Sequence, residues 1–322
     1  MSTELTAGAQ TQISGKKKKI KKTSVTLPFL AMLTPGLVIL LVNNYLPMLG
    51  TIMAFQQYRF QNNFIYSILN SQWVGLKNVE FLFRNSTLWE NMRNTIAYNL
   101  AFIALGMVIP VAFAIALNEL WRPRLAKFYQ TMYFLPYFLS WVVVSYLVFA
   151  LFQTNGAVNT MILKPLGIDV KWYNTRNAWP PILIILQSWK YTGYNAVIYL
   201  AALSGISTEY YEAAMIDGVS KRQQIWYITL PLLRPVIIML SLLAVGRIFN
   251  SDFGLFYNVP MGRSALYPVT EVLDTFIYRA MRRANEFGMA TASSLFQSVI
   301  GFITVVSANL AVRKIDPESA LF

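Results

Sequence analysis

Long apolar segments are the dominant feature of this sequence, and they limit the folds that the chain can adopt. They lie at about 27–50, 94–118, 128–152, 179–204, 232–257 and 287–311. Each has the roughly 20 residues that an α-helix needs to cross a hydrocarbon core of about 30 Å. Charged residues make up only 13% of the chain, about half their usual share in a soluble domain. We therefore predict an all-α polytopic membrane protein with six transmembrane helices.

The basic segment GKKKKIKK at 15–22 sets the expected orientation of these helices. Lysines before an apolar run also occur in signal peptides, but this run is long, contains Pro35-Gly36, and is not followed by a small-residue cleavage site. A dense lysine cluster beside the first span favours a cytoplasmic N-terminus. With six crossings both termini are cytoplasmic. We thus expect a basic tail at 1–26, a transmembrane domain at 27–314 and a tail at 315–322.

Composition excludes several classes of function. The chain contains no Cys and no His, so thiol nucleophiles, disulfides, imidazole bases and histidine-ligated metals are excluded. Its 14 carboxylates are scattered, and no G-x-x-x-x-G-K-[ST] motif is present. The net charge of +13 could suggest nucleic acid, but much of it flanks apolar spans, where anionic lipid favours it. We expect no enzymatic activity, no metal, no cofactor of its own and no nucleic-acid partner.

A polar segment, STEYYEAAMIDGVSKRQQIWYITLPLLRP, follows the fourth apolar run and lies on the cytoplasmic side in this topology. Ser207 or Thr208 can cap a first short helix. Asp217-Gly218 is a turn pair, and Ser220 with Gln223 is a capping-box pattern that starts a second helix. Leu230-Pro231 is expected to end that helix, because the residue before a proline avoids helical backbone angles. Pro235 can then open the fifth span.

The surface of these two helices allows two interpretations. Small residues at helical spacing (Ala213, Ala214, Gly218) lie beside large apolar and aromatic ones (Tyr210, Tyr211, Met215, Ile216, Val219). Such a surface fits the groove of a partner protein. It equally fits an interfacial hairpin packed on the bilayer or on its own span ends.

The spacing of this segment resembles a known motif. Glu212-Ala213-Ala214, Gly218, Ile228 and Leu230-Pro231 stand at the positions of the EAA loop of binding-protein-dependent ABC importer permeases. Other stretches, such as FYQTMYFLPYFLSWVVVSY and RKIDPESALF, look like permeases that import oligosaccharides with a surface lipoprotein; the likeness covers about 28–322. The resemblance implies a type I importer permease architecture. It also implies that the loop at 205–231 couples to an ATPase through Tyr211, Glu212, Ala213, Ala214, Met215, Asp217, Gly218, Ile228, Leu230 and Pro231.

The same resemblance implies a set of partners and a location. These are a second homologous permease in a heterodimer, two cytoplasmic ATPase subunits that bind ATP and Mg, and an extracellular solute-binding lipoprotein. The substrate would be an oligosaccharide, and the assembly would lie in the bacterial plasma membrane.

Polar and aromatic residues within the fourth and fifth spans are candidates for the solute path. Charged residues inside spans are costly and mark functional sites by default, and sugars need stacking faces with hydrogen-bonding groups. The candidates are Trp189, Lys190, Tyr194, Asn195, Tyr199, Arg247, Asn250 and Asp252. Aromatic residues near span ends also form interfacial belts, so a structural role is the alternative for each. The excess of positive charge would suit an acidic oligosaccharide.

Two other functions remain open from the residues alone. A secondary carrier driven by an ion gradient would place carboxylates within its spans, and here Asp252 is the one good candidate. A structural scaffold would use the loop for docking without transport. The outer segments at 51–92, 153–178 and 258–286 are expected either to form the rim of a cavity or to pack on one another.

Overall fold

A computed structural model describes residues 23–317 and 320, as two compact units that divide at Gly50 and Thr51. The two units are described separately below. The tails predicted at 1–26 and 315–322 lie largely outside the described residues.

The first unit is a single helical segment. It consists of α1 (Thr23–Leu40), a π-helical turn η1 (Leu41–Tyr45) and α2 (Leu46–Met48), and it leads into the 3-10 turn η2 (Leu49–Phe55). Pro35 lies inside α1 and does not interrupt it. The large apolar side chains from Phe29 to Leu49 are exposed within the unit. Such a surface suits contact with lipid or with another helix.

The second unit holds all other elements. In chain order these are β1 (Gln56–Gln57), α3 (Phe64–Asn70), β2 (Gln72–Trp73), α4 (Lys77–Arg84), α5 (Ser86–Asn118), α6 (Pro123–Phe134), η3 (Leu135–Phe138), α7 (Trp141–Phe152), η4 (Val158–Leu163), η5 (Lys164–Leu166), η6 (Trp172–Asn174), η7 (Arg176–Ala178), α8 (Trp179–Ser204), α9 (Thr208–Ile216), α10 (Lys221–Gln224), η8 (Ile225–Thr229), α11 (Leu230–Val245), α12 (Phe253–Asn258), η9 (Ser264–Leu266), α13 (Tyr267–Thr270), α14 (Leu273–Ala284) and α15 (Phe287–Ile315). The strands pair antiparallel, with Gln56 opposite Trp73.

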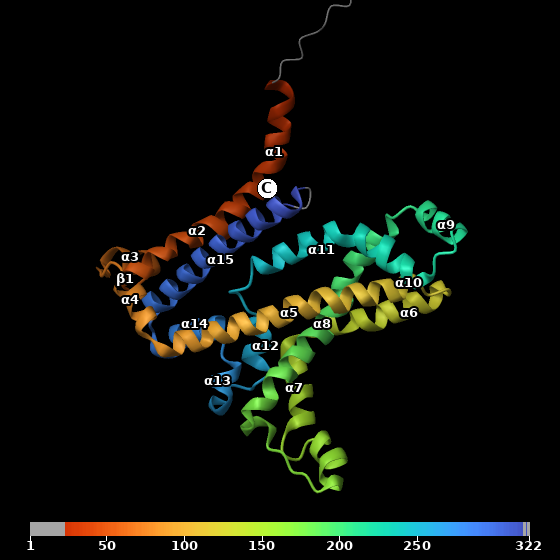
Figure 1. Ribbon diagram of the computed structural model, residues 1–322. Coiled ribbons are helices and arrows are strands. Elements are labelled where there is room, and N and C mark those ends of the chain that lie inside the picture. Colours follow the sequence, from red (N-terminus) through yellow and green to blue (C-terminus); the bar gives the residue numbers. More distant parts are fainter. Residues whose placement is uncertain (1–22, 318–319, 321–322) are drawn as a thin grey trace, which may run out of the picture. The chain divides into compact units, whose positions relative to one another are not determined.

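Helix α5 organises this second unit. Its 33 residues span about 50 Å at 1.5 Å per residue. It packs most extensively on α8, and it also contacts α11 and α14 (Figure 1). Three hydrophobic clusters lie along it, containing Leu88, Tyr98 and Ala114 in turn. The position of a residue along α5 therefore indicates its depth within the second unit.

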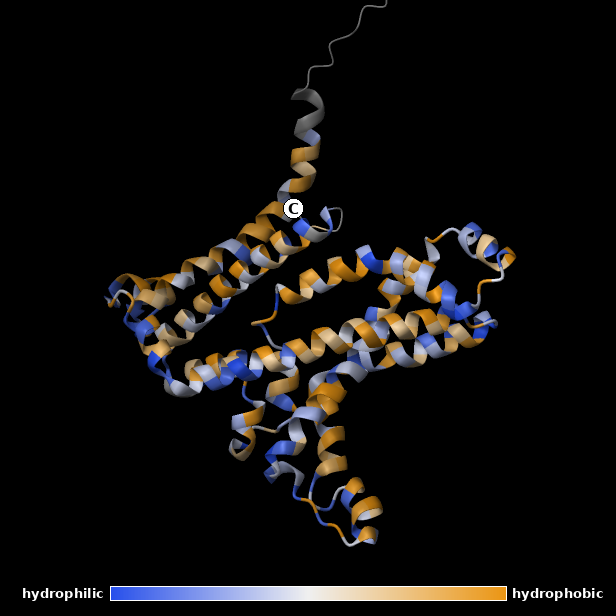
Figure 2. Ribbon diagram, viewed as in Figure 1, coloured by the Kyte–Doolittle hydropathy of each residue, from blue (hydrophilic) through white to orange (hydrophobic). Residues whose placement is uncertain are grey.

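The helices differ in how well they suit a bilayer. Four stretches are long and apolar enough to cross one, namely Pro28–Phe55, Ser86–Asn118, Lys221–Val245 and Phe287–Lys314, and the pair Pro123–Phe138 with Trp141–Phe152 adds a fifth if it forms one crossing. Helix α8 has 26 residues, but its polar side chains lower its mean hydropathy. Figure 2 shows the long helices as mainly hydrophobic, with more hydrophilic residues around α9 and α10. Six crossings therefore stay a prediction.

The span predicted at 128–152 is not one straight helix. It consists of α6, the turn η3 and α7, and the two apolar halves are bent by 96°. Ser140 begins α7 as its N-cap, with its side-chain oxygen accepting from the Val143 amide at 3.3 Å. Local capping chemistry thus starts a new helix inside an apolar run.

The span predicted at 232–257 is also interrupted. Helix α11 ends at Val245, and the chain turns through 246–252 before α12 begins at Phe253. Asp252 is the N-cap of α12 and accepts from the Leu255 amide at 3.3 Å. The break was not expected, because Arg247, Asn250 and Asp252 were interpreted as polar residues within a continuous span and not as the end of a helix.

Leu230-Pro231 does not end the second loop helix, contrary to the prediction. Helix α10 continues through the π-helical turn η8 directly into α11, and Pro235 lies inside α11. A proline ring clashes with the carbonyl four residues before it. In the π-helical turn η8, which precedes Pro231, the backbone hydrogen bonds join residues five apart instead of four. The helix can therefore continue through the proline. Other bounds differ less: the helix predicted at 94–118 begins at Ser86, and that predicted at 287–311 extends to Ile315.

Candidate functional site

The loop between α8 and α11 folds as two short helices with the predicted caps. The Ser207 hydroxyl accepts from the Glu209 amide at 3.3 Å and caps α9. The Gln223 side chain accepts from the Ser220 amide at 2.9 Å at the start of α10. Gly218 adopts a φ of 72° between the two helices, a conformation that glycine reaches at little cost.

The loop presents part of the predicted coupling set to solvent. Those exposed are Glu212, Ala213, Met215, Asp217, Gly218 and Pro231, whereas Ala214 is buried and Tyr211, Ile228 and Leu230 are half-buried. The buried and half-buried members of the set pack within the loop. They would therefore contribute to ATPase coupling indirectly, by stabilising the loop. Three exposed apolar side chains outside the set, Ile216, Trp226 and Tyr227, belong to the same surface. The sequence already indicates Ile216 on the loop surface, whereas Trp226 and Tyr227 were missed, because aromatic residues just before an apolar span carry no signal of their own.

A cavity of about 770 Å³ lies among α5, α8 and α11. Polar groups and aromatic rings share its wall with aliphatic side chains. From α5 it receives Asn99, Phe102 and Met107; from α8 Gln187, Tyr191 and Asn195; and from α11 and the following turn Ser241, Ala244 and Arg247. The α5 residues of the wall, 99–110, lie in the middle of that helix, so the cavity is at mid-depth of the second unit.

The structure brings together six of the eight predicted path residues. Those lining the cavity are Tyr194, Asn195, Tyr199, Arg247, Asn250 and Asp252. Trp189 is outside the lining and 42% exposed. The whole contribution of α5 was missed, because Asn99 and its neighbours are single polar residues in an apolar run and carry no signal of their own.

Lys190 does not line the cavity. It is buried, and its ammonium donates to the carbonyl oxygens of Pro136 at 3.2 Å, Tyr137 at 2.9 Å and Leu139. Its Nζ also lies 5.2 Å from the ring centroid of Trp141, within cation–π range. The three carbonyls belong to the bend between α6 and α7, where helical hydrogen bonding stops. Lys190 therefore satisfies backbone acceptors that the bend would otherwise leave unpaired.

The two charged residues of the cavity differ in their surroundings. The Asp252 carboxylate accepts from Trp141 Nε1 at 2.8 Å and from Tyr191 Oη at 2.9 Å, which holds it against the wall. Arg247 is exposed, and within the described part of the chain its guanidinium has no ion pair or side-chain hydrogen bond. The cavity therefore offers one unneutralised cation.

The turn at 246–252 that presents Arg247 is held from three elements. Asn99 of α5 donates to the carbonyls of Ile248 at 2.8 Å and Asn250 at 3.1 Å. Asp274 of α14 accepts from the Ser251 amide at 2.6 Å, and Gln297 of α15 donates to the Phe249 carbonyl. The irregular backbone is thus satisfied by side chains, as required where it lines a cavity at membrane depth.

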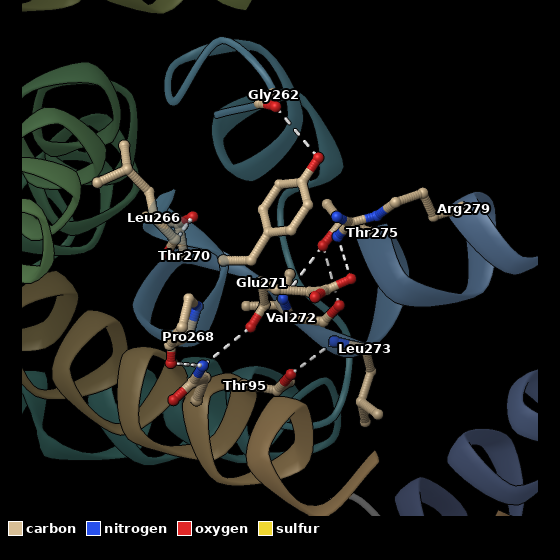
Figure 3. A network of polar contacts seen from close by, with 12 residues as sticks. Thr95, Gly262, Leu266, Pro268, Thr270, Glu271, Val272, Leu273, Thr275 and Arg279 are labelled. Carbon is tan, nitrogen blue, oxygen red and sulfur yellow. Dashed lines mark hydrogen bonds and ion pairs between the residues drawn. The ribbon is translucent and has the colours of Figure 1, made fainter. Parts of the chain in front are cut away.

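A second cavity of about 560 Å³ lies among α7, α12 and α14, beside a dense polar network. In this network Arg279 pairs with Glu271 and lies over the Tyr267 ring, with Cζ 3.7 Å from the ring centroid (Figure 3). Asn94 and Thr95 of α5 bond the backbone of Glu271 and Leu273. Burial raises the pKa of the Glu271 carboxyl, and the Arg279 cation opposes that rise. The network joins α13 and α14 to α5.

The network and the loop lie at opposite ends of α5. Asn94 belongs to the network, whereas Glu119, just after α5, pairs with Lys221 of α10 at 3.1 Å. The 24 residue steps from Asn94 to Asn118 span about 36 Å of helix, slightly more than a hydrocarbon core. The cavity with Arg247 lies between these two ends.

Among the residues that the structure describes, no group of three or more acidic side chains could hold a metal ion. The first cavity therefore combines neutral polar groups and aromatic rings with the Asp252 carboxylate and with Arg247, a cation that has no ion pair among the described residues.

This architecture agrees with a known family. The family model described as the binding-protein-dependent transport system inner membrane component matches residues 106–317, which include most of the cavity wall and the whole loop. The chain belongs to this family. It is therefore a multi-pass membrane permease component rather than an enzyme.

Relatives of this permease extend over nearly its whole length. The polygalacturonan/rhamnogalacturonan transport system permease protein YteP of Bacillus subtilis (strain 168) is 32% identical over 98% of both chains. Protein LplB of the same organism is 31% identical over 89% of both. The lactose transport system permease protein LacF of Rhizobium radiobacter is 29% identical over 83% of this chain and 94% of its own.

Two solved structures share the fold of the permease. One is a bacterial ABC transporter involved in the import of the acidic polysaccharide alginate, with a TM-score of 0.82, 29% identity, and coverage of 92% of this chain and 98% of that chain. The other is the bacterial alginate ABC transporter in complex with an alginate pentasaccharide-bound periplasmic protein, with a TM-score of 0.81. The predicted all-α permease fold is thereby confirmed.

Proposed function

We propose that this permease translocates acidic oligosaccharides through the cavity among α5, α8 and α11. The observation that carries the proposal is Arg247, which has no ion pair among the described residues and lines a cavity with tyrosine, asparagine and glutamine side chains. A guanidinium binds a sugar carboxylate with two parallel hydrogen bonds. Aromatic rings and amides suit the faces and hydroxyls of the sugar rings.

The names of similar proteins also support this substrate class. The alginate import named for the similar structures and the polygalacturonan transport named for YteP agree with an acidic carbohydrate.

The energy for transport would come from separate subunits. We propose that two cytoplasmic ATPases bind ATP and Mg and dock on the loop at 205–231 through its exposed residues, Glu212, Ala213 and Met215 among them. A second homologous permease would complete the membrane part, and an extracellular solute-binding lipoprotein would deliver the sugar. In the bacterial plasma membrane both termini would then be cytoplasmic.

Uptake into liposomes tests this proposal. The permease is reconstituted with the second permease, the ATPase and the binding protein that co-purify with it from membranes. Uptake of a galacturonate oligomer is then compared with that of a neutral galactose oligomer. We expect ATP-dependent uptake of the acidic oligomer. Arg247→Gln should reduce it by about ten- to a hundredfold, because a bidentate carboxylate contact contributes roughly 1.5–3 kcal/mol.

Arg59→Gln is the matched control, because Arg59 is an exposed cation outside the cavity, and it should leave uptake unchanged. Equal loss in both variants would contradict the role of Arg247. Uptake that persists without ATP and follows a proton gradient would instead indicate a secondary carrier.

A further inference from the structure

The loop at 205–231 is joined to α11 by a π-helical turn. Helix α10, the turn η8 and α11 run without a break from Lys221 to Val245. Single π-helical turns inside helices are rare and concentrate at functional positions. The turn lies between the loop and α11, so a displacement of the loop would be transmitted through it to α11.

A chain of buried and partly buried hydrogen bonds crosses from α9 to this turn. Tyr211 Oη lies 3.0 Å from Thr229 Oγ1, which lies 3.4 Å from the Gln224 carbonyl oxygen. A threonine hydroxyl has one proton. Because Thr229 gives it to the carbonyl, Tyr211 must be the donor to Thr229. Gln224 Nε2 in turn donates to the Val219 carbonyl at 3.3 Å.

The chain is shielded from water, since Thr229 is 3% exposed and Gln224 is 2% exposed. Gln224 Oε1 is buried and has no partner among the described residues. The network therefore leaves one acceptor unsatisfied in this arrangement. A shifted loop that supplied a donor would be a second stable arrangement, and coupling requires an element with two arrangements.

The far end of α11 forms the wall of the cavity. Leu240, Ser241, Leu243 and Ala244 line it, and Arg247 follows directly. Ser241 is 12 residues beyond Thr229, about 18 Å along the helix. A tilt imposed at Thr229 would move Ser241 and the turn that presents Arg247.

We propose that the Tyr211–Thr229 hydrogen bond transmits displacement of α9 to α11 and thereby to the cavity. This inference rests on the proposed function, in which α9 docks on an ATPase. Tyr211 is then a positioning residue, which acts through Thr229 and not by touching the ATPase or the solute. This interpretation revises its predicted role as a coupling contact.

Removal of the two hydroxyl groups tests the link in the reconstituted complex. The variants are Tyr211→Phe, Thr229→Val and the double variant. The measurements are co-purification of the ATPase, basal ATPase rate, ATPase rate with solute-loaded binding protein, and solute taken up per ATP. We expect unchanged co-purification and basal rate, but a stimulated rate and an uptake per ATP that are about fivefold lower. The double variant should lose no more than either single variant.

Two controls separate the link from mere folding. Tyr210→Phe removes the hydroxyl of the neighbouring tyrosine, which is 57% exposed, and should behave as wild type. Thr229→Ser keeps the hydroxyl and should restore coupling. The proposal is overturned if Tyr211→Phe matches Tyr210→Phe, or if it lowers co-purification and basal rate together with uptake. Absence of any stimulation in the wild type would instead contradict the proposed function itself.

Discussion

Lys190 shows how a charged residue inside a helix that is predicted to span the membrane can be structural. Such a residue marks a functional site by default, and the sequence offered no reason to treat it otherwise. Its ammonium instead binds three carbonyls at the bend between α6 and α7, beside the Trp141 ring. The bend leaves carbonyl oxygens without a complete set of helical partners, and the long lysine side chain can reach them. The cation is therefore buried at the bend.

Lys190→Met should therefore reduce stability and leave selectivity unchanged. It removes a charged donor and leaves backbone acceptors unpaired in a buried place, so we expect a loss of about 3 kcal/mol. Thermal unfolding of the purified complex in detergent measures the loss as a lower Tm. Per folded molecule, the ratio of acidic to neutral uptake should equal that of wild type.

Lys77→Met provides the comparison for Lys190→Met, since Lys77 is an exposed lysine of α4, and it should leave Tm unchanged. A changed uptake ratio with normal Tm in Lys190→Met would instead place Lys190 in the solute path.

At the scale of elements, α6 and α8 make a close backbone contact just before the bend. A Cβ at Gly193 would be 2.1 Å from the Tyr133 carbonyl oxygen, so only glycine lets the two backbones approach this closely. Lys190 is one turn earlier on the same helix and binds the bend that follows α6. The glycine and the lysine together hold the broken helix against α8.

Gly193→Ala should separate the two helices and destabilise the protein by about 1–3 kcal/mol, as expected for overpacking. Gly106→Ala is a matched control, because a Cβ at that glycine, inside α5, meets nothing within 4 Å. It should keep or slightly raise the stability, since alanine favours a helix over glycine. Thermal unfolding of both variants measures the difference, and equal Tm values would show that the α6–α8 contact can relax.

At the scale of the whole molecule, the function depends on which end of each helix lies on which side of the membrane. Within the second unit, α5 separates the Glu271–Arg279 network from the loop by more than a hydrocarbon core, with the cavity between them. The proposed docking surface at one end, and at mid-depth Arg247 without an ion pair among the described residues, suit transport of a solute across a bilayer. The predicted cytoplasmic position of the loop follows from the lysine cluster at 15–22.

Single cysteines can test this topology, because the natural chain contains none. Trp121→Cys and Ile216→Cys replace exposed residues near the loop, and Leu69→Cys and Asp169→Cys replace exposed residues at the other side of the predicted topology. In intact cells a membrane-impermeant maleimide should label only positions 69 and 169. After lysis all four should react. Labelling of position 216 in intact cells would reverse the orientation.

The all-α membrane fold, the central loop with its caps and six of the residues that line the cavity could be read from the sequence. These features depend on local chemistry: apolar length, capping residues such as Ser207 and Ser220, and polar residues within apolar runs. Each of these features is encoded in a short stretch of neighbouring residues and does not depend on contacts with residues far along the chain. The EAA spacing is a local pattern as well.

Only the tertiary structure decided which polar residues face the cavity and which satisfy backbone. Lys190 and Asp252 are alike as charged residues in spans, but one binds the bend after α6 and the other lies on the cavity wall. The breaks at 139–140 and 246–252 are stabilised by residues from other helices, among them Lys190, Asn99 and Gln297. Hydrogen bonds between residues more than 40 positions apart leave no periodic trace, because each depends on packing that local sequence does not encode.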